Sequence, residues 1–185
     1  MLEEKKISFI STDVLREIAL NLIDKTKRNE SFPFGNESNE EIFKLPTANI
    51  VHRQWQEALS LKSIINIFIR YEIDNDKDFV IEGVHIIPEI IAEFMGDDLI
   101  GEKIRAVTLI DKNEQQVLGG LKSNMSPGWL FDADHITLTK VAKFVAEFSV
   151  KVEQEAYKYK TPVFERTVNF KKDISMVLDL LLRPK

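Results

Sequence analysis

The sequence contains no cysteine, which excludes disulfide bonds and thiolate metal sites in this chain. Such a composition is typical of a reducing compartment, so we expect a cytoplasmic location. No apolar run approaches the roughly 20 residues of a membrane-spanning helix. The charged residues 1–6 also lack the apolar core of a signal peptide. We therefore expect no membrane partner.

Positive charge is not in excess either, because 30 acidic residues outweigh 25 Lys and Arg and leave a net charge of −5 at pH 7. That balance argues against a nucleic-acid partner. Glycine is scarce, with seven residues in the chain and one adjacent pair, Gly119 and Gly120. A loop that wraps phosphate groups needs clustered glycines, and no segment matches G-x-x-x-x-G-K-[ST].

What is present is a chain of 185 residues, 44% of them hydrophobic, which predicts one globular domain over residues 1–185. Apolar periodicity predicts strands that alternate with helices, and hence an α/β fold with a parallel sheet. The expected strands cover residues 7–10, 79–82, 103–110 and 161–165. The expected helices begin near residue 14 and also cover 48–74, 89–95, 117–121, 137–160 and 171–182.

The polar segment 26–47 contains proline and glycine breakers and predicts a long loop with a short helical piece at 40–44. Loops of this length are often lids or substrate-binding segments. The acidic turn at 74–78 resembles a calcium loop only superficially, since the glycine and distal glutamate of such loops are missing. We expect no metal site formed by protein residues alone.

Two predicted strands end in polar residues that could do chemistry. In a parallel sheet, ligands bind beyond the carboxyl ends of the strands. Glu82 and His85 follow one strand, and Asp13 follows another with Arg16 one turn later. Two plainer interpretations stay open: Asp13 is only a helix cap, and His85 is a structural histidine. Arg53, near the start of the long helix, either faces a ligand or is an ordinary surface residue.

Three segments together resemble a known family. They are Ile-Ser-Thr-Asp-Val-Leu-Arg-Glu at 10–17, Val-Ile-Glu-Gly-Val-His-Ile-Ile-Pro at 80–88, and 155–165 with Asn169 and Phe170 behind it. This combination is similar to the P-loop small-molecule kinases, most specifically their 2-phosphoglycerate kinase-like branch. The second segment is the most specific, and the resemblance covers residues 7–182. It implies a three-layer α/β fold with a parallel sheet.

On the acceptor side, the resemblance implies roles for the residues at the strand ends. Asp13 would bind the acceptor and serve as its general base, since a carboxylate can accept a hydroxyl proton. Arg16 would pair with an anionic group of the substrate. Glu82 would lie in the acceptor site or orient Mg²⁺ through water, and His85 and Arg53 would contact substrate. The implied substrate is a small anionic or hydroxylated molecule.

On the nucleotide side, the resemblance implies ATP and Mg²⁺ as cofactors. Lys112 and Lys122 fall where such kinases carry arginines that neutralise the transferring phosphate. Arg166, Thr167 and Asn169 fall in the turn that packs on the adenine base. The lysines depart from the family pattern.

The largest departure is at the front, where the family carries a first strand and its glycine-rich loop. The chain begins, on this comparison, at the tail of the first helix, so we expect about 30 residues of a βα unit to be absent. The absent strand would be the central one, between the strands at 79–82 and 103–110. Either the sequence is a truncated product, or the half-sheets close on each other, or another chain fills the gap.

Three hypotheses follow. The first is an ATP-dependent kinase that acts on a hydroxyl acceptor, and we expect this chain to be inactive because it has no phosphate loop. The second is a non-catalytic pseudokinase or interaction module of the same fold. The third is a plain α/β domain in which the polar strand ends are structural. An exposed sheet edge would favour a homo-oligomer.

Overall fold

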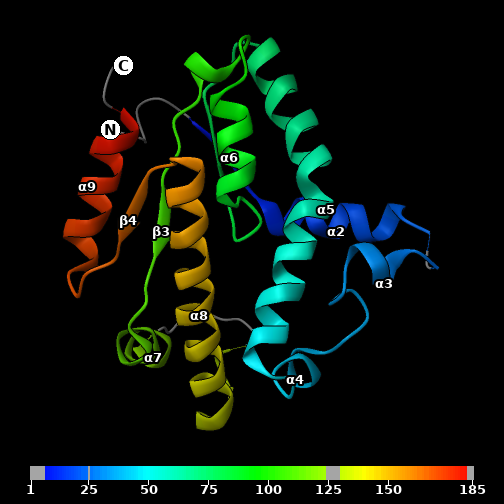
Figure 1. Ribbon diagram of the computed structural model, residues 1–185, viewed down its shortest axis with the longest axis vertical. Helices are drawn as coiled ribbons and strands as arrows, with labels where there is room; N and C mark the ends of the chain where they lie inside the picture. Colours follow the sequence, from blue (N-terminus) through cyan, green and yellow to red (C-terminus); the bar gives the residue numbers. More distant parts are fainter. Residues whose placement is uncertain (1–6, 25, 124–129, 183–185) are drawn as a thin grey trace. The chain divides into compact units, whose positions relative to one another are not determined.

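The computed structural model describes residues 7–24, 26–123 and 130–182 (Figure 1). They form a mostly helical α/β structure with two small parallel sheets. The chain divides into two compact units, each described by itself below. Unit 1 comprises Met1–Asn36 and Arg53–Ile104, and unit 2 comprises Glu37–His52 and Arg105–Lys185. The expected single domain stays a prediction.

Unit 1 contains the β1–β2 sheet and the helices that follow its strands. Its elements are β1 (Ser8–Ser11), α2 (Thr12–Leu22), α3 (Arg28–Ser31), most of α5 (Thr47–Asp74), β2 (Phe79–Glu82), α6 (Pro88–Met95) and the 3₁₀ turn η1 (Gly101–Lys103). β1 and β2 pair in parallel, with Ser8 opposite Phe79 and Ser11 opposite Glu82. Both strands therefore end at the same edge of the sheet, and the chain enters α2 and the β2–α6 turn there.

The core of unit 1 is built by α5 and α6. Ala58, Leu61 and Ile65 of α5 and Ile90 of α6 are fully buried, as the nearly all-round apolar pattern of α5 predicts. An ion pair between Lys62 and Glu93 joins the two helices. The rings of Phe68 on α5 and Phe79 on β2 meet edge to face, with centroids 5.5 Å apart. These contacts hold β2 and the turn after it in place.

Gly83 lies directly after β2 and has φ of +144°, a conformation that side chains other than glycine rarely adopt. A Cβ atom at this position would lie 1.8 Å from the Thr12 hydroxyl oxygen. The glycine of the Glu-Gly-Val-His segment is therefore required by the close approach of the first turn of α2.

Unit 2 contains the β3–β4 sheet. Its elements are α4 (Asn39–Ile42), the start of α5, β3 (Thr108–Ile110), α7 (Glu114–Ser123), α8 (His135–Tyr159), β4 (Val163–Glu165) and α9 (Phe170–Leu182). β3 and β4 pair in parallel, and α8 lies along β3 (Figure 1). The facing sides of α7 and α8 share a small core, made by Val117, Leu118, Leu138 and Ala142.

The structure confirms the α/β class and corrects two details. First, the described strands form two separate two-stranded sheets, where the sequence predicted one parallel sheet. Second, the predicted strand at 103–110 shortens to Thr108–Ile110, because β4 offers only Val163–Glu165 as a ladder partner. The helix α3 was not predicted. The sequence also predicts an irregular segment at 125–134, of which residues 125–129 lie outside the described residues.

Candidate functional site at the carboxyl edge of the β1–β2 sheet

Thr12 and His85 meet where β1 and β2 end. The Thr12 hydroxyl lies 3.0 Å from Nδ1 of His85. Both side chains are buried, with exposures of 0% and 2%. A hydrogen bond here satisfies two polar groups that would otherwise be costly to bury. The contact also explains why Gly83 has to leave room for Thr12.

Asp13 follows Thr12 and points outward. Its side chain is 75% exposed, and its Oδ1 lies 3.8 Å from Nδ1 of His85. The cap of α2 is the Ser11 side chain, which accepts a hydrogen bond from the Asp13 amide. The plain interpretation of Asp13 as the cap is therefore wrong, and its carboxylate is open to solvent beside the buried imidazole.

Arg16 lies one turn after Asp13 and binds a buried carboxylate. Its Nε donates to Glu57 Oε2 at 2.6 Å, and its Nη2 donates to Glu57 Oε1 at 3.2 Å. Glu57 is 1% exposed, whereas Arg16 is 17% exposed. Burial lowers the pKa of Arg16, but the hydrogen bond and charge of Glu57, helped by Glu17 and Asp13, outweigh it and raise that pKa. This two-point geometry is the strong form of a charge-assisted pair.

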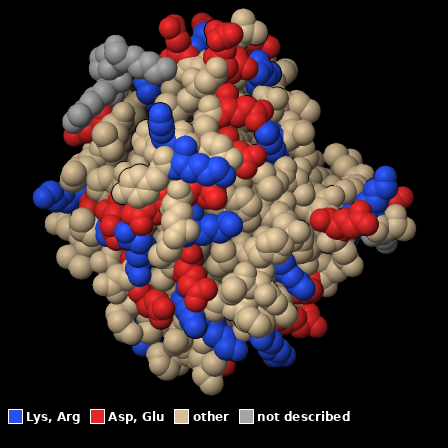
Figure 2. Space-filling view, in the orientation of Figure 1, with Lys and Arg blue, Asp and Glu red and all other residues tan. Residues whose placement is uncertain are grey.

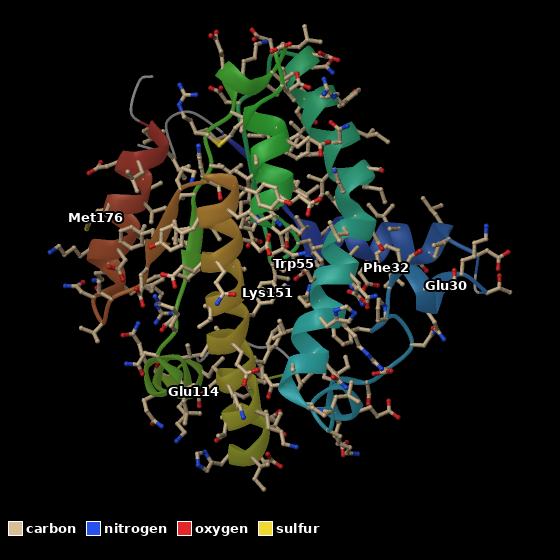
Figure 3. All side chains as sticks on the ribbon, viewed as in Figure 1. Glu30, Phe32, Trp55, Glu114, Lys151 and Met176 are labelled. Carbon is tan, nitrogen blue, oxygen red and sulfur yellow. The ribbon has the colours of Figure 1, made fainter. Side chains whose placement is uncertain are left out.

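Glu57 also connects other parts of the site. Its Oε1 accepts the backbone N–H of Phe34 at 2.8 Å, and its Oε2 lies 4.0 Å from Nε2 of His85. A loop residue, a helix residue and the histidine thus surround one carboxylate. Two labelled residues of unit 1, Trp55 on α5 and Phe32 after α3, are largely buried (Figure 3).

His85 is held neutral by its surroundings. Burial lowers its pKa to about 4, with a smaller contribution from the nearby Arg16 cation, and the Glu57 carboxylate offsets only part of this. A neutral imidazole has one donor and one acceptor nitrogen. At neutral pH the ring therefore adds no charge to the site, and its Nδ1 shares a hydrogen bond with the Thr12 hydroxyl.

The sequence analysis missed Thr12 and Glu57. The signal for Glu57 is present, because it lies among buried residues of α5 such as Trp55, Ala58 and Leu61. A carboxylate on an apolar helix face needs a cationic or hydrogen-bonding partner. Thr12 carries no such signal, since a threonine at a helix start is usual.

The two other residues predicted to bind the acceptor substrate are Glu82, which lies apart from this network, and Arg53. Glu82 ends β2 and is exposed, and within the described residues no hydrogen bond or ion pair is seen for its side chain. Arg53 lies with its guanidinium carbon 6.0 Å from the ring centre of Phe34. It is therefore linked to the site through the loop residue that Glu57 binds.

The predicted nucleotide residues belong to unit 2, where most are engaged with protein groups. Lys112 Nζ lies 2.7 Å from Glu153 and 3.2 Å from Glu165. Arg166 lies 3.5 Å from Asp111 and stacks near Phe170. Of the remaining three, Lys122 is exposed, the Thr167 hydroxyl donates to Asp173 at 2.8 Å, and the Asn169 side chain accepts the Lys172 amide at the start of α9.

The described part of the face shown in Figure 2 carries no patch of one charge sign. Lys and Arg are interspersed with Asp and Glu on the face shown in Figure 2. Among the described residues, no group of three His, Asp or Glu side chains is placed to hold a metal ion. None of the described helices combines the length and apolarity that crossing a membrane requires.

Comparison with known proteins returned nothing: the chain matches no family model, no curated protein and no solved structure.

Proposed function

We propose that this chain binds a small hydroxylated, anionic molecule at the carboxyl edge of the β1–β2 sheet, as the acceptor half of a P-loop kinase-like fold. The observation that carries the proposal is the meeting of Asp13, Arg16 and His85 around Thr12 and Glu57. A solvent-exposed carboxylate, a fixed guanidinium and a neutral imidazole are groups that can bind a hydroxyl and an acid together.

The pairing pattern also supports the kinase-like fold. The resemblance implies an absent central strand between β2 and β3, so that β2 and β3 would not pair with each other. The described strands pair in this way, as two separate parallel sheets. In this proposal Asp13 accepts the hydroxyl proton, Arg16 holds the anionic group, and His85 orients the ligand.

Two of the predicted nucleotide-side cations, Lys112 and Arg166, do not fit Mg²⁺–ATP. The Lys112 ammonium already has two carboxylate partners, and the Arg166 guanidinium faces the buried Asp111. Cations that are neutralised within the protein are poorly suited to the charge of a triphosphate. We therefore derive no transfer step and favour a non-catalytic, acceptor-binding role for this chain, with kinase activity as the alternative.

A binding experiment tests the proposal. The chain is titrated with 2-phosphoglycerate, glycerate and Mg²⁺–ATP while thermal unfolding is followed. A ligand at 100 times its Kd adds roughly 2.7 kcal/mol of stability. We expect stabilisation by one of the hydroxy acids and none by Mg²⁺–ATP. The absence of any hydroxy-acid effect at millimolar concentration would overturn the proposal. Stabilisation by Mg²⁺–ATP together with phosphate transfer would favour the kinase alternative.

A matched pair of variants locates the binding. Asp13→Asn removes the exposed carboxylate beside His85, and Asp179→Asn makes the same change on the exposed side of α9 in unit 2. Loss of a hydrogen bond to a charged group costs about 1.5–3 kcal/mol, or roughly 10- to 100-fold in affinity. We expect this loss for Asp13→Asn and an unchanged affinity for Asp179→Asn. Equal affinities in both variants would place the ligand elsewhere.

A further inference from the structure

The guanidinium of Arg16 is shared between two carboxylates of very different character. Its Nε and Nη2 atoms donate to Glu57, at 2.6 and 3.2 Å. Its Nη1 atom donates to Glu17 Oε1 at 3.0 Å. The Glu57 side chain is 1% exposed, whereas the Glu17 side chain is 64% exposed. The guanidinium therefore has two edges that are held with unequal strength: the Glu57 edge, formed by Nε and Nη2, and the Glu17 edge, formed by Nη1.

The Glu57 edge is fixed. Removal of one partner from a buried ion pair leaves an uncompensated charge, which is strongly unfavourable. Glu57 also accepts the Phe34 amide, so releasing it would leave a loop N–H without its partner. Exchange of this edge for a ligand would therefore disrupt the protein interior.

The Glu17 edge can exchange. Ion pairs between exposed side chains contribute little, because water and salt compete for both partners. Arg16 and Glu17 are also neighbours in sequence, and side chains at adjacent helix positions do not face each other. The Glu17 carboxylate can therefore turn into solvent while α2 keeps its shape. Nη1 would then be free one helical turn from the exposed carboxylate of Asp13.

We propose that Glu17 occupies the anion subsite of this site as a displaceable internal competitor, while Glu57 is the positioning residue that presents the Arg16 Nη1 edge to an incoming carboxylate or phosphate. The inference rests on the proposed function, because it assigns the anionic group of the same ligand. It explains how a cation paired within the protein can still receive a substrate: only the exposed half of its pairing is exchanged.

Inorganic phosphate and acetate serve as probes of the subsite, and the ¹⁵N-labelled arginine side chains are followed by NMR. Arg16→Lys assigns the Arg16 signals. We expect either anion to shift the Nη signals of Arg16. Glu17→Gln should strengthen binding of the better anion by up to about fivefold, the range that an exposed ion pair allows. Glu40→Gln is the matched control, because Glu40 is an exposed glutamate paired with Lys44 in unit 2.

Unchanged affinity in Glu17→Gln, or equal strengthening in Glu40→Gln, would overturn the inference. So would the absence of phosphate and acetate binding in both the wild type and Glu17→Gln. Binding of these simple anions without binding of any hydroxy acid would overturn the proposed function alone. Hydroxy-acid binding with the same affinity in the wild type and in Glu17→Gln would overturn this inference alone.

The Arg16 Nε–H signal tests the role of Glu57. A donor held by a buried carboxylate resonates downfield and exchanges slowly with water. We expect this signature in the wild type, unchanged when phosphate binds, and lost in Glu57→Gln. If Glu57→Gln does not fold, the wild-type titration decides: an Nε–H signal that moves as far as the Nη signals would show that the Glu57 edge exchanges too, contrary to the inference.

Discussion

The two sheets end in polar clusters that differ in depth. At the β1–β2 edge, Glu57, His85 and Thr12 are each at most 2% exposed. Beyond the β3–β4 sheet, Asp111 is buried too, but the ion-pair cluster of Lys112, Glu153 and Glu165 is shallower, with exposures of 28%, 23% and 54%. Both clusters place cations against carboxylates beyond parallel strands. Depth decides what each interaction contributes, because desolvation makes a buried unpaired charge far more costly than an exposed one.

The largest expected effect comes from breaking the buried pair. Glu57→Gln leaves the Arg16 guanidinium without its buried counter-charge, with only the exposed Glu17 remaining, which costs about 3–5 kcal/mol of unfolding free energy. Glu153→Gln removes a carboxylate from Lys112, which retains Glu165, so we expect a much smaller loss. Urea unfolding of both variants measures the difference. Similar losses in the two would show that depth does not separate the clusters.

The second largest loss of stability is expected at Gly83, which leaves room for the Thr12 side chain. Gly83→Ala forces a side chain into a left-handed φ and against the Thr12 hydroxyl. We expect a loss of about 3 kcal/mol from backbone strain and from the disturbed hydrogen bond.

Gly119→Ala is the opposite case in unit 2. Gly119 lies inside α7, where an added Cβ would meet nothing within 4 Å. Alanine there should stabilise by about 0.5–1 kcal/mol. The midpoint temperature of thermal unfolding should therefore fall in Gly83→Ala and rise in Gly119→Ala. A shift in the same direction in both variants would contradict the conclusion that Gly83 is required by the close approach of Thr12.

The lowered pKa of His85 predicts that the stability of the protein depends on pH. Its pKa is about 4 in the folded protein against 6.5 for an unperturbed histidine. Between these values the unfolded chain binds a proton that the folded protein does not. Stability is therefore intact above pH 6.5 and falls as the pH drops toward 4, by about 3 kcal/mol at roughly 1.4 kcal/mol per pKa unit.

The comparison of variants isolates this contribution. His85→Asn keeps a polar side chain beside Thr12 and should remove most of the slope between pH 6.5 and 4. His135→Asn changes an exposed histidine at the start of α8 and should keep the wild-type slope. If the wild type and His85→Asn lose stability in parallel, other groups account for the acid sensitivity.

The smallest expected effect concerns Lys112. Lys112→Met removes a cation whose pKa is raised by hydrogen bonds to Glu153 and Glu165. Because the pair is exposed to solvent, we expect a small change in the urea midpoint that vanishes in high salt. A large loss that persists in salt would mean that unit 2 depends on this cluster as unit 1 depends on Glu57.

Much of the local structure was predictable because its causes are local. The run of aromatic and β-branched residues at 79–81 predicted β2, Pro88 is typical of the first turn of a helix such as α6, and the apolar stripe of α8 predicted its span. The strand predicted from residue 103 failed because strand length depends on a partner elsewhere in the chain. Glu57 was missed for a similar reason, since its partners Arg16 and Phe34 are 41 and 23 residues away.

The sequence by itself determined the alternation of strands and helices, the absence of a glycine-rich phosphate loop, and the candidates Asp13, Arg16 and His85. These follow from residue type and spacing, which act over a few residues. Only the tertiary structure decided that Asp13 is exposed while His85 is neutral and buried, and that Arg16 shares its charge between Glu57 and Glu17. Burial and long-range pairing set those properties, because desolvation and counter-charge depend on what the folded chain brings near each group.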